Sequence, residues 1–339
     1  MKRTIALMLS LVMMFSFTAC GGSNDQAATS AASESSATEE KAETKELGTV
    51  ILMEKDDDMK NTYTAIAVNP EAPFVDANGT AVSDVAINTA GADALMHWLL
   101  SEEALAMAAD FGYDDYGEYL FYRQDDAPVY DGEIAKATED TKTIRLSTTT
   151  SVNDSGLLAE LLPVFEQKYG YTVEVTSDGT GKAIAAAENG NADLILVHAK
   201  DKEEEFVQKG FGRVVDGFDS ERVSFLYNYF VLCGPKDDPA GVKDAASVKD
   251  AFAAIAEQKA PFISRGDGSG THTKELTLWP ESLGITEDAA SFEQYKDWYT
   301  SANAGMGACL VMAEEQGAYI LTDKATFLTF QANGGQIEK

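Results

Sequence analysis

The chain has 339 residues, of which 45% are hydrophobic and 9% aromatic, enough for the core of one large or two ordinary domains and too many for disorder throughout. Its 56 acidic and 26 basic residues give a net charge of −30, which repels phosphate backbones and excludes a general nucleic-acid-binding protein. Any bound anion must therefore be held by local geometry. With only three cysteines a disulfide scaffold is excluded, and the apolar surroundings of Cys233 and Cys309 favour buried thiols over a single disulfide.

The start of the chain is typical of a secretory signal. Lys2 and Arg3 precede an apolar run over 5–17, which is shorter than the roughly 20 residues that span a bilayer. Small residues then lead to Cys20, and the whole segment resembles a bacterial lipoprotein signal. We expect 1–19 to be removed and Cys20 to be lipidated, with an ordinary cleaved signal as the alternative.

The next segment is polar. Residues 21–46 contain no aromatic residue and no aliphatic residue larger than alanine, so nothing offsets the entropy of ordering them. We expect 20–46 to be a disordered tether that starts with the lipidated cysteine. The folded body is then extracytoplasmic and anchored to the cell membrane by that lipid.

Residues 47–129 form a first block. Strands are expected over 49–55 and 62–70, and a helix near 92–111. The block looks too small for a core of its own, so it is either a separate small domain or a completion of the sheets that follow. Residues 130–142 are polar and are expected to be a linker.

From residue 143 onward, strand-like runs alternate with helical periodicity. Strands are expected over 144–150, 171–177, 192–199, 222–235, 260–265 and 318–322, and helices over 156–170, 179–190, 247–258, a segment through Trp279, 292–300 and from 305. The third strand is an unbroken apolar run, which suits a parallel sheet. This alternation predicts an α/β fold with mainly parallel sheets flanked by helices.

Three loops lead from an apolar strand into a helix through small or hydroxylated residues. They are 148–151 (TTTS), 179–181 (GTG) and 266–271 (GDGSGT). Helix N-termini present unpaired N–H groups, and Arg265 adds a forked cationic donor before the third loop. Each loop alone is more often a simple cap or turn, but three of them in one α/β chain favour an oxyanion site.

The sequence does not match the motifs of other functional classes. The GTGK at 179–182 lacks the remaining glycine and hydroxyl of a phosphate-binding loop, and no GxSxG nucleophile elbow is present. The three histidines have no zinc spacing; His97 is expected on a helix face and His198 at a strand end. A secreted hydrolase and an adhesion protein remain as alternatives, but neither explains three anion-type loops.

The tungstate-binding proteins of bacterial ABC importers resemble this chain over nearly all of 143–339. The resemblance is carried by STTTSVNDSGLLAELLPVFEQKYG, GTGKAIAAAENGNADLILVHA, FISRGDGSGTHTKELTLW and GMGACLVMAEEQGAYILTDKATFL. It implies a periplasmic-binding-protein type II fold, in which two α/β lobes joined by two crossing strands close on an oxyanion in the cleft. It also implies a monomer without enzymatic activity, cofactor or resident metal, which captures tungstate or molybdate and passes it to an ABC permease and its ATPase.

The order of the segments departs from that family. Residues 47–129, with TVILMEKDD, IAVNP, HWLLSEEA and YLFY, resemble the C-terminal part of the family but come first here. We predict a circular permutation, with new termini after Thr329, the old termini joined by 130–142, and 47–339 forming one two-lobed unit. The alternative is a duplicated C-terminal piece or a fused small domain.

The resemblance also implies ligand residues by motif position. The anion ligands are Thr149, Ser151, Thr271 and the positive Arg265, with Thr150, Thr180 and Ser269 as weaker candidates. Asp267 is expected to pair or cap rather than to touch a dianion. Because the same loop also resembles one of phosphate-binding proteins, and a carboxylate accepts a proton from hydrogen phosphate, a phosphate-binding protein of an ABC importer is the alternative.

Overall fold

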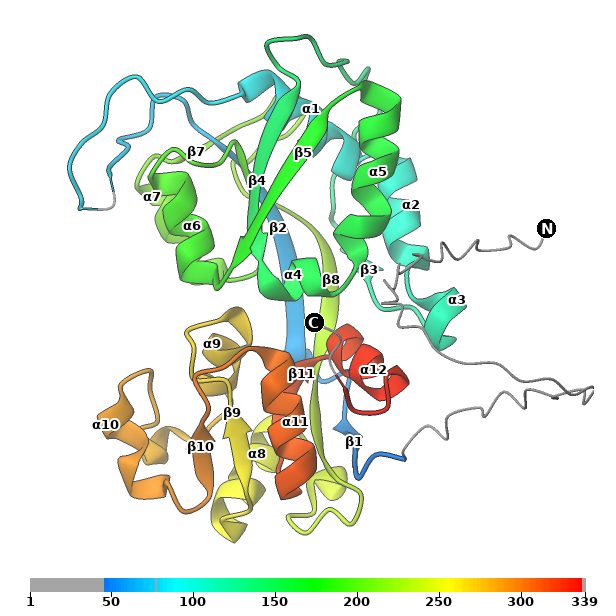
Figure 1. The fold of residues 1–339 in the computed structure, drawn as a ribbon, viewed down its shortest axis with the longest axis vertical. Helices are drawn as coiled ribbons and strands as arrows, with labels where there is room; N and C mark the ends of the chain where they lie inside the picture. The colour runs from blue at the N-terminus through cyan, green and yellow to red at the C-terminus, as the bar shows by residue number, and fades with distance from the viewer. Residues whose placement is uncertain (1–45, 77, 337–339) are drawn as a thin grey trace, which may run out of the picture. The chain divides into compact units, whose positions relative to one another are not determined.

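The computed structural model describes residues 46–76 and 78–336 (Figure 1). The predicted signal, the lipidation site Cys20 and all but the last residue of the predicted tether lie outside the described residues. Among the residues that are described, no helix combines the length and the apolar character needed to cross a bilayer.

Strands and helices alternate along the second part of the chain, which gives the predicted α/β fold. The strands are β1 (Thr49–Met53), β2 (Lys60–Val68), β3 (Tyr122–Arg123), β4 (Thr143–Thr149), β5 (Thr172–Asp178), β6 (Leu194–Val197), β7 (Gly212–Arg213), β8 (Val223–Pro235), β9 (Phe262–Ser264), β10 (Tyr299–Ser301) and β11 (Ile320–Asp323). The α-helices are α1 (Thr89–Leu99), α2 (Glu102–Asp110), α3 (Tyr113–Tyr116), α4 (Thr150–Asp154), α5 (Leu157–Tyr169), α6 (Thr180–Glu188), α7 (Lys200–Gln208), α8 (Val248–Gln258), α9 (Gly270–Leu276), α10 (Ala289–Phe292), α11 (Met306–Gln316) and α12 (Lys324–Ala332). Short 3₁₀ helices cover Asp57–Met59, Val242–Asp244, Glu281–Leu283 and Glu293–Tyr295.

The sheets are mixed, so the expectation of mainly parallel sheets is wrong for their middle. β4 lies parallel to β5 and β6, and β9 lies parallel to β10. In contrast, β2 is antiparallel to β6 and β8, and β8 is also antiparallel to β1 and β11. The physical reason is that β2 meets strands remote in sequence, so no crossover helix imposes parallel order on it.

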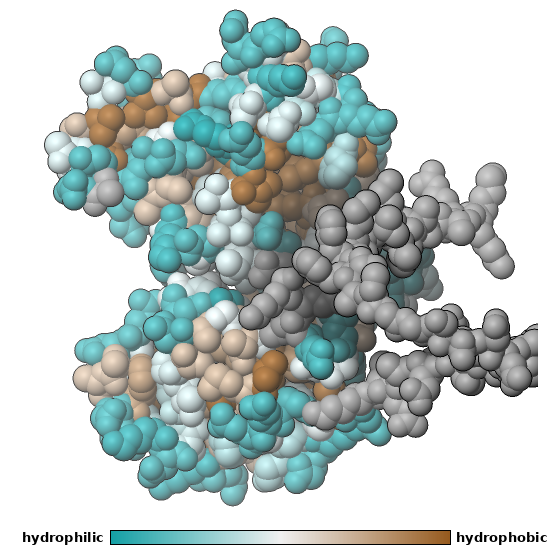
Figure 2. Space-filling view, in the orientation of Figure 1, coloured by the Kyte–Doolittle hydropathy of each residue, from teal (hydrophilic) through white to brown (hydrophobic). Residues whose placement is uncertain are grey.

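β2 and β8 run side by side and connect separate hydrophobic cores (Figure 1). β8 contributes Phe225 and Leu226 to the core around β4, α1 and α5. Farther along the same strand, Phe230 and Leu232 belong to the core around α8, β9 and β10. Hydrophilic and intermediate residues predominate on the face shown in Figure 2, as expected when the apolar side chains fill such cores.

Within 47–76 and 78–129, the first block forms no sheet of its own. β2 lies between β6 and β8, and β1 pairs with the far end of β8. The single helix expected over 92–111 is two helices, because the Ser101 hydroxyl accepts a hydrogen bond of 3.3 Å from Ala104 N and starts α2 as an N-cap. The block therefore completes the sheet of the rest of the chain.

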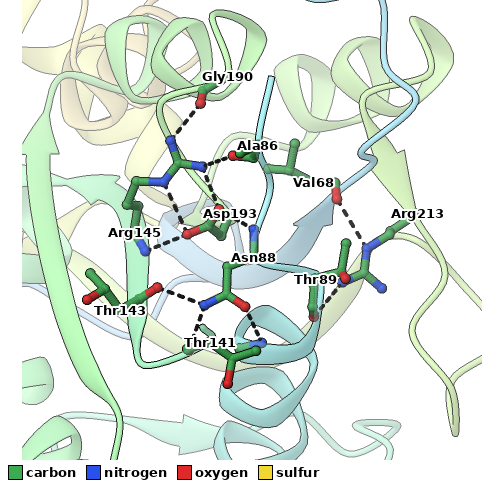
Figure 3. Close-up of polar contacts among 11 residues, drawn as sticks. Val68, Ala86, Asn88, Thr89, Thr141, Thr143, Arg145, Gly190, Asp193 and Arg213 are labelled. Atoms are coloured by element: carbon green, nitrogen blue, oxygen red, sulfur yellow. Dashed lines mark hydrogen bonds and ion pairs between the residues drawn. The ribbon is translucent and has the colours of Figure 1, made fainter. Parts of the chain in front are cut away.

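A polar network fastens the first block to the end of the predicted linker (Figure 3). The Asn88 side-chain amide donates to the carbonyls of Thr141 and Thr143, both at 2.7 Å. Its Oδ1 accepts from Gly91 N at 2.9 Å and so caps α1. One side chain thus holds the start of α1 against the chain entering β4.

Arg145 and Asp193 extend this network (Figure 3). The Asp193 side chain is 1% exposed and pairs with Arg145 Nη2 at 2.6 Å and Nε at 3.2 Å. The same guanidinium donates to the carbonyls of Ala86 and Gly190 at 2.8 Å each. The buried carboxylate is therefore compensated, and the loop before α1 is joined to β4 and to the turn after α6.

The predicted linker is packed against its neighbours. The ring of Tyr130 stacks on His97 of α1 with 3.7 Å between centroids, and Ala137 N donates to the carbonyl of Tyr169 at 2.8 Å. His97 lies on a helix, as predicted. These contacts place the start of the linker on α1 and its middle beside the end of α5.

Two further expectations have clear outcomes. The helix expected over 292–300 is wrong in its second half, because Trp298 and Tyr299 are buried in the core and β10 pairs with β9 there. Cys233 and Cys309 are buried and not joined in a disulfide, as favoured by their apolar surroundings.

Candidate functional site

The TTTS segment forms the end of β4 and the start of α4. Thr149 caps α4, with its Oγ1 accepting from Val152 N at 3.3 Å. Thr150 and Ser151 begin the helix, and Ser151 is buried. The buried Oγ1 of Thr150 lacks a hydrogen-bond partner among the described residues.

The GTG loop lies at the same edge of the sheet. β5 runs parallel to β4 with Thr149 opposite Asp178, so the loop that follows Asp178 begins beside the TTTS segment. Thr180 opens α6 with its side chain fully buried, and its Oγ1 has no partner in the described part of the chain. Two hydroxyls that need hydrogen bonds therefore sit at neighbouring strand ends.

Arg265 opens the third loop directly after β9. Its Nη2 donates to Asp267 Oδ2 at 2.5 Å, while its buried Nε has no partner among the described residues. Burial by itself would raise the pKa of Asp267, but hydrogen bonds from Ser269 and the charge of Arg265 hold that pKa below its usual value. Asp267 thus pairs with the arginine as predicted, and the pair offers N–H donors with little net charge.

The remaining third-loop candidates open α9. Ser269 caps it, with its Oγ accepting from His272 N at 3.3 Å. Thr271 is buried, and its Oγ1 is unpartnered within 46–76 and 78–336. Because α9 has seven residues and α4 five, the dipoles of these two helices are small.

His198 joins the two sets of loops. It follows β6, which pairs with β4, and its Nε2 lies 2.9 Å from Thr149 Oγ1. Its ring fills the space beside Gly270, where an added Cβ would lie 2.3 Å from His198 Cε1. The residue next to Gly270 is the candidate ligand Thr271, so one histidine contacts both parts of the site.

The imidazole of His198 is neutral at neutral pH. Burial is the main cause that lowers its pKa to about 4, and the positive charges of Arg265 and Lys274 lower it further. If Nε2 accepts from Thr149, the single proton of that hydroxyl is used; if Nε2 donates, the proton is free for a ligand. The tautomer of His198 therefore decides whether Thr149 is a donor.

The sequence placed His198 correctly at a strand end but did not indicate this role. The available signal was its position at the carboxyl end of the apolar strand expected over 192–199. Loop residues converge at the carboxyl ends of parallel strands.

The candidate site contains buried groups that can donate a hydrogen bond and that have no hydrogen-bond partner among the described residues. They are the hydroxyls of Thr150, Thr180 and Thr271 and the Nε of Arg265. Leaving such a group unsatisfied costs about 1–3 kcal/mol, so the arrangement suits a small ligand rich in acceptor oxygens. Among residues 46–76 and 78–336, no three or more His, Cys, Asp or Glu side chains group as they would around a metal ion.

Comparison with known proteins identifies relatives of the second part of the chain. Residues 135–339 match the model of the PBP superfamily domain. The tungstate-binding protein TupA of Peptoclostridium acidaminophilum is 45% identical over 207 residues, which cover 60% of this chain and 67% of that protein. An ABC transporter anion-binding protein of Haloferax volcanii is 47% identical over 193 residues, or 57% of this chain and 52% of that protein, so the match spans about half of its length.

Two solved structures are similar in sequence to part of this chain. The tungstate ABC transporter protein of Geobacter sulfurreducens is 43% identical, with a TM-score of 0.46 over 56% of this chain and 75% of that chain. TupA of Desulfovibrio alaskensis G20 is 38% identical, with a TM-score of 0.46 over 57% of this chain and 72% of that chain. The predicted resemblance to tungstate-binding proteins is confirmed by the sequence relatives, which are named as binding proteins, in agreement with the prediction of a binding protein rather than an enzyme.

Proposed function

Because this chain belongs to the PBP superfamily, we propose that it is the solute-binding protein of an ABC importer and that its solute is tungstate, with molybdate as a second ligand. The observation that carries the proposal is the set of buried donors without partners, Thr150, Thr180, Thr271 and Arg265, all within the part of the chain that matches the family. Relatives at 45% and 36% identity are named for tungstate binding.

The charges around Arg265 favour a fully ionised oxyanion. Asp267 Oδ2 already accepts from Arg265, and Oδ1 accepts from Ser269 N. Hydrogen phosphate carries a proton that needs an acceptor, whereas tungstate and molybdate need only donors. Phosphate therefore stays the alternative ligand, and it requires one of these carboxylate oxygens to accept a further hydrogen bond.

We infer that the core around β4 and the core around β9 are two lobes that close on the anion. The support is that β2 and β8 pass from one core to the other, while His198 and Gly270 bring the two sets of loops into contact. Closure excludes water from the neutral donors, which strengthens each hydrogen bond to the ligand.

Isothermal titration with tungstate, molybdate, sulfate and phosphate tests the function. We expect tight tungstate binding, and Arg265→Ala should weaken it tenfold or more, because a charge-assisted hydrogen bond is worth about 1.5–3 kcal/mol. Arg123→Ala, at a half-exposed surface pair, is the matched control and should bind as the unchanged chain does. Binding of phosphate alone would establish the alternative, and no binding of any of the four would refute both.

We also propose that the chain is circularly permuted. A Cβ added at Gly335 would lie 2.6 Å from Leu47 Cδ2, so the two ends of the described chain meet. The family match begins at residue 135 and leaves out the first block, while a third of the P. acidaminophilum relative is left without a counterpart. A shared sheet for β2, β6 and β8 supports a permutation more than a fused domain.

Reordering the gene tests the permutation. A chain of 143–336 joined by a short linker to 47–129 should fold cooperatively and bind tungstate with unchanged affinity. The fragment 143–339 alone should not fold, because β6 and β8 would lose their pairing with β2. A fragment that folds and binds by itself would rule out the permutation.

We propose that Cys20 is lipidated and holds the protein outside the cytoplasm at the membrane, beside its permease and ATPase. The support is the signal-like sequence before that cysteine. Labelled fatty acid should enter the mature protein, and Cys20→Ala should prevent the labelling and release the protein from the membrane fraction. A mature, water-soluble chain that lacks Cys20 would contradict this.

A further inference from the structure

A cavity of about 530 Å³ lies next to the candidate oxyanion site. Its walls come from β2, β8, α7 and α9, and it shares His198 and Gly270 with the oxyanion site. α7 and α9 both contribute to this lining, and α9 lies below α7 in the view of Figure 1. This volume is in the range that holds small organic molecules and is far larger than one tetrahedral oxyanion needs.

The charged residues that line this cavity are mostly cationic, whereas those of the whole chain are mostly acidic. Two acidic side chains and five cationic ones, Lys60, Lys200, Lys202, Arg222 and Lys274, line it, although acidic residues outnumber basic ones by 56 to 26 in the whole chain. At physiological salt the Debye length is about 8 Å, so distant acidic residues are screened and the local cations dominate. The cavity is therefore a place where an anion is attracted.

Two of these cations are unpaired. Arg222 is bound to the buried Glu203 at 2.6 Å, and Lys60 lies over an aromatic ring with 3.8 Å between its Nζ and the centroid. In contrast, the ammonium groups of Lys202 and Lys274 form no hydrogen bond or ion pair with any residue that the structure describes. They belong to α7 and α9, so they line the cavity from two different helices.

The partial burial of Lys274 also favours a bound counter-ion. Desolvation is the main cause that lowers the pKa of Lys274, with Lys249 lowering it further and Asp58 opposing. Nδ1 of His198, a residue 9% exposed, and Oγ1 of Thr273 are buried without partners among the described residues, and both residues line the cavity. Nδ1 carries a proton for an anion in this cavity when Nε2 accepts from Thr149. A bound anion with several oxygens would satisfy groups that the protein itself leaves unsatisfied.

We propose that this cavity is a second anion site, which takes a multivalent anion whose acidic groups are far enough apart to contact both Lys202 and Lys274. The inference goes beyond the proposed function, because it does not depend on which oxyanion occupies the first site. An anion held between α7 and α9 stabilises the contact of His198 with Gly270, so binding at the two sites is coupled and the coupling is reciprocal.

Isothermal titration of the full chain with tripolyphosphate in 0.15 M NaCl tests the proposal, once without and once with saturating tungstate. Citrate repeats the measurement with carboxylates as the acidic groups. We expect tripolyphosphate to bind under both conditions and Lys202→Gln with Lys274→Gln to weaken it at least tenfold. The control pair Lys182→Gln and Lys296→Gln, at lysines 79% and 69% exposed, should leave it unchanged.

Each other result overturns the proposal. Absence of tripolyphosphate and citrate binding refutes the site, competition between tripolyphosphate and tungstate shows one site instead of two, and equal weakening by the control pair shows only general charge attraction. The two proposals fail separately: tungstate binding without polyanion binding refutes the second site alone, and polyanion binding without binding of any single oxyanion refutes the proposed function alone.

Discussion

Replacing Gly270 by alanine tests whether His198 positions the oxyanion site. The new Cβ would lie 2.3 Å from His198 Cε1 and 3.0 Å from Nδ1, whereas ordinary contacts are 3.4–4 Å. The obstacle is a buried ring, so the imidazole must move by about 1 Å or more. That displacement breaks its 2.9 Å hydrogen bond with Thr149.

The size of the effect follows from this one bond. Without this bond the Thr149 hydroxyl loses the partner that orients it, and one ligand hydrogen bond lost as a result is worth about 1–2 kcal/mol, which predicts roughly five- to thirtyfold weaker tungstate binding. The bond lost inside the protein also costs about 1–2 kcal/mol of stability, of which up to about 1 kcal/mol is offset because Gly270 begins α9 and alanine favours a helix over glycine. The prediction is thus a loss of affinity without a loss of fold.

Titration with tungstate and urea unfolding are the two assays. Gly181→Ala is the matched control, since Gly181 lies in the first turn of α6 beside Thr180 and an added Cβ there has nothing within 4 Å. Adding Gly270→Ala to His198→Ala should cost no further affinity, because the ring that is displaced is already gone. Unchanged binding by Gly270→Ala, or additive losses in the double variant, would refute the reasoning.

Two predictions concern stability. Burial raises the pKa of Glu275 to about 7 from 4.5, so the stability contributed by its protonated form is lost as pH rises through that interval. Glu275→Gln should remove this loss. Its free energy of unfolding, measured relative to that of the unchanged chain, should therefore be up to about 3 kcal/mol higher at pH 8 than at pH 4. A difference that urea unfolding finds to be the same at both pH values would contradict this. Asn88→Asp should destabilise the fold more than Asn88→Ala, although aspartate is a good N-cap, because it would face two carbonyls and the buried Asp193 without donors. Equal unfolding free energies for the two variants would contradict a repulsion between the new carboxylate and these oxygen atoms.

The parts of the candidate site that could be predicted are those that depend only on residues close together in the sequence. A strand that ends in TTTS, GTG or RGDGSGT places hydroxyls at the carboxyl edge of a sheet whatever surrounds it. In the described part of the chain, the Oγ1 atoms of Thr150, Thr180 and Thr271 are buried without hydrogen-bond partners. The helix expected over 156–170 was equally local, and α5 buries one apolar face, formed by Leu157, Leu158, Leu161, Leu162 and Phe165.

The parts that could not be predicted depend on neighbours remote in sequence. His198 acquires its role only because β6 pairs with β4 and because Gly270, 72 positions later, leaves room for its ring. The antiparallel middle of the sheet requires β2, which comes from the first block. Around Trp298 the aromatic spacing fits a helix, but burial against β9 selects a strand, so tertiary packing overrides local pattern.

The two proposed anion sites differ in how their charge is balanced, and this difference predicts different responses to salt. In the proposed oxyanion site the charge of Arg265 is offset by Asp267 at 2.5 Å, and the other donors are neutral hydroxyls, so attraction beyond contact distance is weak. In the second cavity Lys202 and Lys274 form no ion pair in the described part of the chain. Raising NaCl from 0.05 to 0.5 M, roughly a threefold shorter Debye length, should therefore change tungstate affinity little and weaken tripolyphosphate binding at least tenfold. Equal salt dependence of the two ligands would mean that net charge, and not the arrangement of neutral donors, holds the oxyanion.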